Sequence, residues 1–464
     1  MDAQLRICDE IRTEWAEKQE KQPLALVDTY GCQQNEADSE QLRGMLRRMG
    51  LGFTEDPEEA AIIVINTCAV REHAESRVLG NVGALAHTKK RHPEQIICMC
   101  GCAMQEPRMS EKIRRSFRHV DLVFGPQVLW KFPGYIQEIL KNRGRIFETP
   151  DVPGQIAEGL PVVRRGKVKA WVSIMYGCNN FCTYCIVPYV RGRERSRAPE
   201  LIVEECRQLV AEGYKEITLL GQNVNSYGKD LGLNTDFSDL LRMVNDIPGD
   251  FLIRFMTSHP KDASDRLFHT MAECEKVAPA LHLPFQAGND RVLAAMNRRY
   301  THEDYLRKVE ALRSLIPDIV LTSDVIVGFP GETNEEFQDT IRLLEEVRFD
   351  SLFTFLYSRR DGTPAAELPD VLTKEEKNRN FQQLLEVQNR ISAEKHAEYV
   401  GKTYRVLVDG TSSDPEHGLS ARTAGGRLVH MTGPESLVGT WTEARITDSS
   451  TWALYGEPAG MQNE

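Results

Sequence analysis

The order of apolar and polar positions divides the chain into three regions. From about residue 24 to residue 140, short apolar runs alternate with amphipathic stretches. The apolar runs predict strands at Leu24–Tyr30, Ala61–Thr67 and Gln95–Met99, and the stretches between them predict helices at Glu36–Met49 and Arg71–Lys89. The helical spacing is clearest in Leu42, Met45, Leu46 and Met49, which fall on one helix face. Strands that are apolar throughout need cover on both sides, so this region is expected to form an open parallel sheet.

A second region of alternating strands and helices begins near Lys169. Helical stretches such as Pro199–Glu212 and Glu335–Val347 separate its apolar runs. Those runs predict six strands, at Trp171–Met175, Glu216–Leu220, Leu252–Thr257, Ala280–Pro284, Val320–Val327 and Leu352–Tyr357. Six strand–helix units suit a (βα)6 partial barrel better than a closed eight-fold barrel, which usually needs about 250 residues.

The pattern changes again after a charged helical stretch at Lys374–Tyr399. Short strand-like runs at Tyr404–Val408, Leu428–Met431 and Thr440–Ile446 are broken by Gly and Asp, which predicts a small all-β barrel. The fold class is therefore α/β with a C-terminal β-barrel. We expect a polar extension at 1–21, an N-terminal domain at 22–148, a Pro- and Gly-containing linker at 149–168, the partial barrel at 169–398 and the small barrel at 399–464.

Composition excludes some classes of protein but does not indicate a function. The chain of 464 residues has a net charge of −11, with 41% hydrophobic and 27% charged residues. Total charge thus gives no sign of nucleic acid, and a nucleic-acid site must come from local basic patches. Because no long apolar stretch and no signal-peptide pattern is present, we expect a cytoplasmic protein with no membrane association. We also expect a monomer.

The eleven cysteines are unusual for a cytosolic chain. A disulfide framework does not fit a reducing compartment, and a chain of this length does not need one. We expect Cys8, Cys206 and Cys274 to be small buried apolar residues. The other eight cysteines fall into two patterns that indicate chemistry.

The first pattern is C-x3-C-x2-C, formed by Cys178, Cys182 and Cys185 directly after a predicted strand. Soft thiolate ligands suit iron–sulfur clusters, and three thiolates on one loop leave the fourth iron of a cubane open to another ligand. Zinc is the alternative. It usually takes four protein ligands, or three with a water, and this loop has no nearby His. The motif therefore favours an iron–sulfur cluster.

The second pattern is a set of cysteines that each follow a predicted strand of the N-terminal region: Cys32, Cys68 and Cys102. Parallel strands end at one edge of a sheet, so these cysteines can converge there. Cys98 and Cys100 share a strand face with Cys102, and spacing alone does not choose among the three. The adjoining Gly101 favours Cys102.

The first motif, with aromatic Tyr184 before its last cysteine, resembles the signature of the radical S-adenosylmethionine (SAM) superfamily. The resemblance implies that SAM binds the open iron and is cleaved reductively to a 5′-deoxyadenosyl radical. It also implies that SAM is held by Tyr184 in the cysteine loop and by residues near the strand ends, namely Gln222, Asn223, Gln286, Asp324 and Gly328. The alternative is that these polar residues simply close their strands.

The second set extends the resemblance to the methylthiotransferase family within that superfamily. Tyr30–Asn35, Asn66–Cys68 and Gly101–Cys102 are similar to its three segments that bind an auxiliary cluster, and the likeness covers about residues 24–460. It implies that Cys32, Cys68 and Cys102 hold an auxiliary [4Fe-4S] or [3Fe-4S] cluster, and that the C-terminal barrel is an RNA-binding TRAM module. Gln34 stands where Met is common, and Ala103–Met104 inverts the usual order, but neither change removes a ligand.

Within the family, the segment from Cys178 to Arg197 is most similar to the branch that acts on isopentenyladenosine in tRNA. That resemblance implies methylthiolation of carbon 2 of this base beside the anticodon. SAM would be both methyl donor and radical source, the auxiliary cluster would present sulfur, and a flavodoxin or ferredoxin would supply electrons. Arg191, Arg193, Arg195 and Arg197 are candidate phosphate contacts.

Three alternatives remain open. Sibling enzymes act on threonylcarbamoyladenosine in tRNA or on a ribosomal-protein aspartate, and a non-catalytic iron–sulfur or RNA-binding protein is more remote. Residues 401–464 hold 5 Lys and Arg against 8 Asp and Glu, so RNA binding there would depend on shape and hydrogen bonding more than on charge.

Overall fold

The computed structural model describes residues 2–18, 21–69, 72–150 and 154–459, which separate into two compact units. Unit 1 contains the chain up to Arg165 together with 176–179 and 186–195. Unit 2 contains 166–175, 180–185 and the chain from Ser196 onward. The chain therefore passes between the units several times around the predicted cluster loop, and β8 (Met175–Tyr176) pairs with β9 (Arg195–Ser196) in this stretch.

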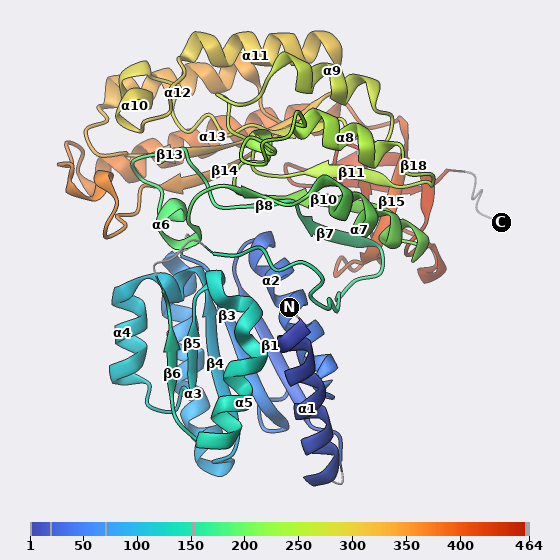
Figure 1. Cartoon of the computed structure of the whole chain (residues 1–464). Coiled ribbons are helices and arrows are strands. Elements are labelled where there is room, and N and C mark those ends of the chain that lie inside the picture. Colours follow the sequence, from blue (N-terminus) through green and yellow to red (C-terminus); the bar gives the residue numbers. More distant parts are fainter. Residues whose placement is uncertain (1, 19–20, 70–71, 151–153, 460–464) are drawn as a thin grey trace. The chain divides into compact units, whose positions relative to one another are not determined.

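Unit 1 is built on a six-stranded parallel sheet in the order β2-β1-β3-β4-β5-β6 (Figure 1). Its strands are β1 (Leu24–Tyr30), β2 (Gly52–Phe53), β3 (Ala60–Thr67), β4 (Ile96–Gly101), β5 (Leu122–Phe124) and β6 (Ile146–Glu148). Its helices are α1 (Asp2–Lys18), α2 (Gln33–Arg48), α3 (Glu72–Arg91), α4 (Pro107–Ser116) and α5 (Phe132–Asn142), with 3-10 turns η1 (Cys102–Gln105) and η2 (Pro126–Lys131).

Each face of this sheet has its own apolar core. Alternate residues of β3, such as Ile62 and Val64, pack with α1, α2 and α5, whereas Ile63 and Ile65 pack with α3 and α4. Side chains alternate between the faces of a strand, so a strand that is apolar throughout fills both cores. The predicted open sheet with covered faces is confirmed. The helix predicted at Arg71–Lys89 is α3, and residue 71 lies outside the described residues.

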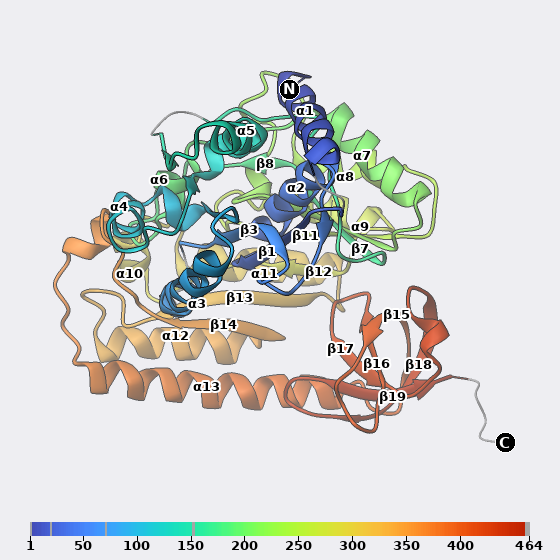
Figure 2. The same ribbon diagram turned by 90° about the horizontal axis from the view of Figure 1, so that it is seen from below.

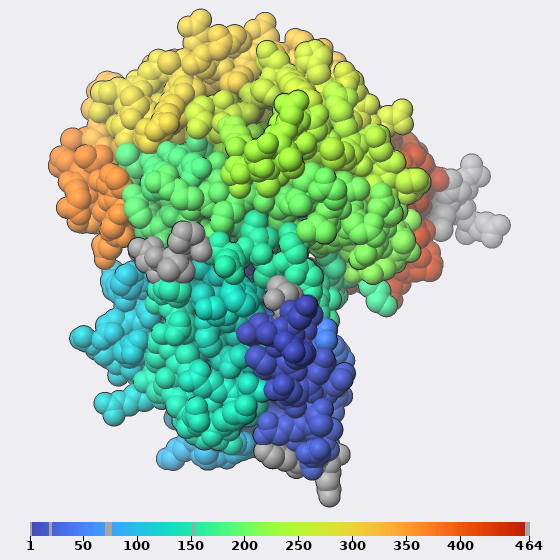
Figure 3. Space-filling model, in the orientation of Figure 1, coloured from blue at the N-terminus to red at the C-terminus, as the bar shows by residue number. Residues whose placement is uncertain are grey.

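The N-terminal segment contributes more than a polar extension. Within it, α1 buries Cys8, Ile11 and Trp15 in the core shared with α2 and α5. Figure 3 shows this helix in dark blue on the surface of unit 1, beside teal α5. Its three apolar residues are spaced three or four apart among charged ones, so only a narrow stripe is apolar. Residues 1, 19 and 20 lie outside the described residues.

Three strands of unit 1 were absent from the sequence prediction: β2, β5 and β6. They are only 2, 3 and 3 residues long, too short to show a period of their own. Each is a strand because it pairs with an already formed neighbour, as Val123 does with Met99 of β4.

The segment expected to be a linker packs closely on α2 over the part that is described. The Val163 amide donates to the Glu40 carbonyl at 3.0 Å. A Cβ on Gly44 would lie only 1.9 Å from the Pro161 carbonyl oxygen, so glycine allows this close approach. Residues 154–165 are therefore fixed to unit 1, and residues 151–153 lie outside the described residues.

Unit 2 contains the six predicted parallel strands. They are β7 (Lys169–Ser173), β10 (Glu216–Leu220), β11 (Leu252–Phe255), β12 (Ala280–His282), β13 (Val320–Val327) and β14 (Ser351–Leu356). They alternate with α7 (Pro199–Ala211), α8 (Phe237–Asn245), α9 (Asp265–Glu273), α10 (Asp290–Ala295), α11 (His302–Leu315) and α12 (Asn334–Val347), and the turn η3 (Val224–Ser226) follows β10. The predicted (βα)6 architecture is confirmed.

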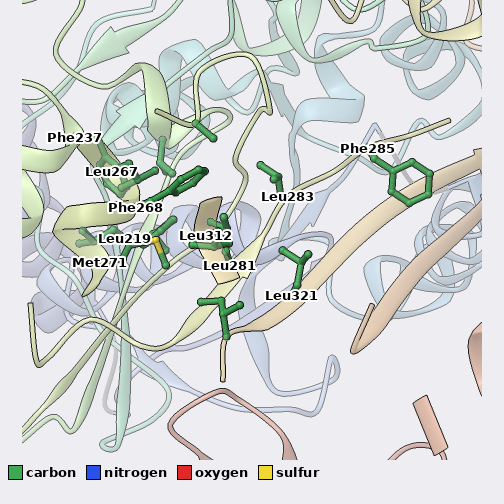
Figure 4. Packing of buried hydrophobic residues seen from close by; sticks show 14 of the residues in the cluster. Leu219, Phe237, Leu267, Phe268, Met271, Leu281, Leu283, Phe285, Leu312 and Leu321 are labelled. Carbon is green, nitrogen blue, oxygen red and sulfur yellow. The ribbon is translucent and has the colours of Figure 1, made fainter. Parts of the chain in front are cut away.

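The six strands hydrogen-bond as two three-stranded sheets, β11-β10-β7 and β12-β13-β14. Between β11 and β12, Ile253 bonds to the backbone of Lys276 and Ala278, so an irregular segment occupies the edge of β11. One apolar core nevertheless spans both sheets. Figure 4 shows Leu219 of β10, Leu281 of β12 and Leu321 of β13 with Leu267 and Phe268 of α9.

The C-terminal part begins with α13 (Lys374–Ala397), preceded by the turn η4 (Pro364–Glu367). A closed barrel follows (Figure 2), formed by β15 (Thr403–Thr411), β16 (Leu419–Thr423), β17 (Leu428–Met431), β18 (Trp441–Ser449) and β19 (Leu454–Pro458), with the turn η5 (Glu435–Leu437). The predicted small barrel is confirmed. In the described part of the chain, no helix has the length and apolar character that crossing a membrane requires.

Candidate active site

Cys32, Cys68 and Cys102 lie at the carboxyl ends of three neighbouring strands of unit 1, β1, β3 and β4. The Cys68 amide donates to the Tyr30 carbonyl at 3.0 Å, which joins two of these strand ends. A hydrogen bond with the Cys68 thiol lowers the pKa of Cys32 to about 6. Burial raises the pKa of Cys102 to about 11, and the charge of Cys32 adds to that increase. The structure therefore brings the three predicted cysteines together at one sheet edge.

Two buried asparagines lock this edge. Asn35 donates through Nδ2 to Oδ1 of Asn66 at 2.9 Å, and Asn66 donates back to the Asn35 carbonyl at 2.8 Å. Both are 0% exposed, and Asn35 Oδ1 accepts from the Cys32 thiol at 3.2 Å. The pair ties the turn after β1 to the end of β3, which fixes the separation of Cys32 and Cys68. Sequence reasoning missed this role, although both residues stood in the quoted motifs.

Gly101 explains why Cys102 leaves the strand. Its φ is +96°, and a Cβ there would lie 2.3 Å from Asn66 Oδ1 and 2.4 Å from the Thr67 carbonyl. Only glycine fits this turn. The two cysteines before it, Cys98 and Cys100, stay in β4 with their side chains in the core under α2 and α5. Burial raises the pKa of both thiols well above the usual range.

The donor set at this edge suits an iron–sulfur cluster. It consists of three cysteine thiols, with a guanidinium, that of Arg191, 3.0 Å from one sulfur. Within the described ranges, no three His, Cys, Asp or Glu side chains converge as they would on a single metal ion. A cluster spreads its thiolates over several irons, so its ligands need not meet at one point.

Arg191 is the one member of the basic run that lies at this edge. Its Nε donates to Cys102 Sγ at 3.0 Å and its Nη2 to Asp38 Oδ2 at 2.7 Å. The side chain is 5% exposed, so it is not placed to contact RNA phosphates as the sequence had suggested. Burial disfavours the cation, but Asp38 and Cys102 outweigh that cost and raise the Arg191 pKa.

The other three arginines of the basic run differ in how exposed their side chains are. Arg195 donates to the carbonyls of Gly154 at 2.9 Å and Arg191 at 3.1 Å, and so supports unit 1. In unit 2, Arg197 donates to the Ser173 carbonyl at 2.7 Å and pairs with Glu205 at 2.9 Å. Arg193 is the exposed member of the four.

The loop that carries Cys178, Cys182 and Cys185 passes from unit 1 to unit 2 after Asn179. In unit 1, the Cys178 amide donates to the Gly192 carbonyl at 3.1 Å, and a Cβ on Gly177 would lie 2.0 Å from the Arg193 carbonyl. In unit 2, the Cys185 amide donates to the Cys182 carbonyl at 2.9 Å. Backbone contacts thus shape the loop on both sides of the boundary.

The segment after α10 braces the part of this loop in unit 2, and sequence reasoning missed it. Asn297 donates to the carbonyls of Asn180 at 3.2 Å and Phe181 at 2.9 Å. The Thr183 amide donates to the Met296 carbonyl at 3.1 Å. Asn297 and Phe181 both have positive φ, of 59° and 48°, and such backbone persists only where its surroundings impose it. The sequence offered one sign of this role: the polar run Asn-Arg-Arg at 297–299 belongs to no predicted strand or helix.

Arg298, which is 4% exposed, connects Cys182 to the barrel strands. It donates to the Pro284 carbonyl at 2.7 Å and to Tyr300 Oη at 3.1 Å, and its Nη1 lies 3.5 Å from Cys182 Sγ. The same nitrogen lies 3.4 Å from Tyr184 Oη. Tyr184, a predicted SAM contact, is therefore anchored through its hydroxyl, which leaves only its ring to line a ligand site.

The other predicted SAM contacts lie after or within strands of unit 2: Gln222 and Asn223 follow β10, Gln286 follows β12, Asp324 lies within β13 and Gly328 follows β13. Gln286, with a φ of +71°, receives a backbone bond from Ile326 at 3.0 Å and donates one to Asp324 at 2.9 Å, so the segment after β12 is joined to β13. Asn223 donates to Asp262 at 2.8 Å. Among the described residues, no hydrogen-bond donor reaches the buried side-chain oxygens of Asn223 and Gln286. Gln222, after β10, is half-buried.

Gly328 follows β13 with a φ of +72°, and its amide donates to Glu332 Oε2 at 2.7 Å. Glu332 is 1% exposed. Burial raises its pKa to about 7, above the usual 4.5, although the Gly328 amide opposes this. The buried carboxyl therefore holds its proton more tightly than an exposed glutamate does.

This pKa predicts how replacing Glu332 with Gln will change stability. Because the folded state binds this proton more tightly than the unfolded state, the protonated carboxyl stabilises the fold below about pH 4.5. That stability is lost as the pH rises through about 7. Glu332→Gln keeps an acceptor for Gly328 but does not ionise. The difference in unfolding free energy between this variant and the parent should therefore shift in favour of the variant, by up to about 3 kcal/mol, as the pH rises from 5 to 8. Urea unfolding at both pH values measures this, and a pH-independent difference would contradict it.

Three family models match separate parts of the chain. Residues 25–125 match the model of an uncharacterised protein family, UPF0004, residues 172–344 match the radical SAM superfamily, and residues 397–459 match the TRAM domain. The chain is 50% identical over 459 residues to a protein of Acetivibrio thermocellus named tRNA-2-methylthio-N(6)-dimethylallyladenosine synthase, covering 98% of this chain and 96% of that protein. A protein of the same name from Alkaliphilus oremlandii is 51% identical over 432 residues, covering 93% and 92%.

Solved structures show the same fold at low identity. The radical SAM methyltransferase TsrM of Kitasatospora setae, solved with tryptophan and a SAM analogue, matches with a TM-score of 0.54 at 13% identity, covering 74% of this chain and 75% of that chain. The cobalamin-dependent radical SAM enzyme OxsB matches with a TM-score of 0.50 at 12% identity, covering 82% and 57%.

Proposed function

Because the chain belongs to the family of the tRNA-2-methylthio-N(6)-dimethylallyladenosine synthases, we propose that it methylthiolates carbon 2 of dimethylallyl- (isopentenyl-) adenosine beside the anticodon of tRNA. The observation that carries the proposal is the convergence of Cys32, Cys68 and Cys102 at one sheet edge, in a chain that also has the Cys178–Cys185 loop. Two cluster sites suit a reaction that needs both a radical and a sulfur source.

Two sets of cysteines would hold the clusters. Cys178, Cys182 and Cys185 would bind a [4Fe-4S] cluster with SAM, and Cys32, Cys68 and Cys102 an auxiliary [4Fe-4S] or [3Fe-4S] cluster. When bound, these groups supply the radical, the methyl group and the sulfur. The protein's own part is positioning: Asn297 and Arg298 brace the first loop, and Asn35 and Asn66 the second site. Residues 22–148 form the auxiliary-cluster domain, 169–398 the radical SAM domain and 399–464 the RNA-binding domain in this proposal.

SAM recognition would fall to the strand ends of unit 2. The buried, unpartnered oxygens of Asn223 and Gln286 can accept from the amino groups of SAM. Gly328, Asp324 and the Tyr184 ring would line its nucleoside, with Gln222 at the rim. Each of these assignments is a proposal: Tyr184 lies in the cysteine loop, Asp324 lies within β13, and the others follow strands of unit 2.

The proposal is tested by nucleoside analysis of tRNA from a strain that lacks the gene. The methylthiolated base should disappear, its unthiolated isopentenyl precursor should accumulate, and the gene should restore the product. Accumulation of unthiolated threonylcarbamoyladenosine, or of an unmodified ribosomal-protein aspartate, would instead favour a sibling activity.

We propose that the enzyme acts as a cytoplasmic monomer, without membrane association and with a flavodoxin or ferredoxin as electron donor.

For tRNA binding, Arg193 is the member of the basic run that we retain as a phosphate contact, because it is exposed. Arg193→Gln should weaken tRNA binding and reduce the slope of log affinity against log salt by about 0.7–0.9. Arg115→Gln is the matched control, since Arg115 is also exposed and lies on α4. Fluorescence anisotropy at several salt concentrations measures both variants. Equal slopes for Arg193→Gln and the parent would remove Arg193 from the RNA surface.

In the C-terminal barrel, the exposed side chain best suited to RNA is Trp452, which is 68% exposed. A base can stack on its ring without a positively charged surface, which fits the acidic balance of residues 401–464.

Arg191 is not part of the RNA surface in this proposal, and Arg195 and Arg197 stabilise their own units.

A further inference from the structure

The buried ion pair of Arg191 and Asp38 has no part in the function proposed so far. Arg191 ends α6 (Val187–Arg191) and lies six positions after Cys185, the last cysteine of the C-x3-C-x2-C loop. Both members of the pair belong to unit 1. The sequence therefore places Arg191 beside one cysteine set, whereas the structure places its side chain on Cys102, a member of the other set.

Arg191 is fixed from several sides. Its guanidinium donates from Nε to Cys102 Sγ at 3.0 Å and from Nη2 to Asp38 Oδ2 at 2.7 Å. Gln34 donates to the other Asp38 oxygen at 3.2 Å, which holds the carboxylate in place. The Arg191 and Asp38 side chains are 5% and 6% exposed. A planar guanidinium that makes two such bonds has one orientation, which a lysine could not reproduce.

The helix that carries Arg191 is itself anchored in unit 1. Gln127 donates to the Val190 carbonyl at 2.7 Å, and Arg195 donates to the Arg191 carbonyl at 3.1 Å. Ile186 and Val190 pack with Ala69 and Cys102 in a small apolar cluster. The contact between Arg191 and Cys102 therefore lies in an ordered, water-poor setting, where a charge acts more strongly than in water.

We propose that Arg191 is a positioning residue for the auxiliary cluster: it fixes the Cys102 ligand and makes the cluster easier to reduce by placing a cation beside a ligand sulfur. Asp38 orients Arg191 and offsets part of its charge. Hydrogen bonds and charges at ligand sulfurs are established determinants of cluster potentials. A cation favours the more negative, reduced state, so its removal lowers the potential, whereas loss of the Asp38 charge raises it.

This inference rests on the proposed auxiliary cluster, and the test separates the two. The parent is the full chain with Cys178, Cys182 and Cys185 replaced by Ala, so that only the auxiliary site remains. Its iron content is measured first, and its midpoint potential and electron paramagnetic resonance spectrum next. A parent without iron would overturn both the proposed function and this inference.

Three variants of that parent decide the role of Arg191. Arg191→Gln should make reduction at least tenfold less favourable, which is about 59 mV for one electron. Asp38→Asn should shift the potential in the opposite direction, and Arg193→Gln, which removes an exposed charge two residues away, should leave it unchanged. Mere disruption of the site would not produce shifts of opposite sign.

Either of two results would overturn the inference: an unchanged potential in Arg191→Gln with full iron content, or shifts of the same sign in Arg191→Gln and Asp38→Asn. If Arg191→Gln binds no cluster, Arg191→Lys takes its place, because it keeps the charge but not the geometry. A smaller downward shift with an altered resonance spectrum would then support the inference, and an unchanged potential and spectrum would overturn it.

Discussion

Replacing Cys32, Cys68 and Cys102 together with Ala is expected to abolish the methylthio product while SAM cleavage continues. The three thiols are the donor set at the edge of the unit 1 sheet, whereas SAM cleavage depends on the separate Cys178–Cys185 loop. The variant should therefore still form 5′-deoxyadenosine when reduced, and its iron content should fall to that of one cluster. Product and 5′-deoxyadenosine are measured in the same anaerobic reaction by mass spectrometry.

Cys98→Ala is the matched control, because Cys98 lies in the core below the same sheet edge and is 0% exposed. It removes a neighbouring thiol without touching the proposed ligands, and should keep both product and iron. Product formation by the triple variant would show that the sulfur comes from elsewhere. Loss of SAM cleavage in that variant would show that the two cysteine sets do not act independently.

The second large effect concerns the substrate. A tRNA that carries isopentenyladenosine should be used on the order of 100-fold better than the same tRNA with plain adenosine, measured as kcat/KM. The five-carbon group offers several apolar carbons for burial, each worth about 0.8 kcal/mol, and that energy positions the base for hydrogen abstraction.

The measurement uses one tRNA transcript, with and without prior enzymatic isopentenylation, so that sequence and fold are identical. Production of 5′-deoxyadenosine without tRNA gives the uncoupled background for both. Equal kcat/KM values would contradict a substrate site built around the isopentenyl group. The radical SAM assignment would stand in that case, because it depends on the cysteine loop and the barrel rather than on the side chain of the base.

The sequence by itself determined the main elements of both units. The long apolar run Ile62–Ile65 became part of a strand within a residue or two of its predicted bounds, because such a run is stable only when buried on both faces. The strand-end rule also placed Cys32, Cys68 and Cys102, since parallel strands expose the same end at one edge. Three strands of unit 1, with 2 or 3 residues each, were not predicted because they form only by pairing with a neighbour.

What only the tertiary structure decided is which side chains meet. Cys98 and Cys100 share a strand face with the expected direction of Cys102, yet the positive φ of Gly101 turns Cys102 out of the strand. The sequence predicts that Arg191 belongs to an exposed basic run, but in the structure it is buried against Cys102 and Asp38. Arg298 stands far from Cys182 in the chain and lies beside it in the fold. Periodicity reports whether a residue is buried, whereas its partners depend on contacts between segments that are distant in sequence.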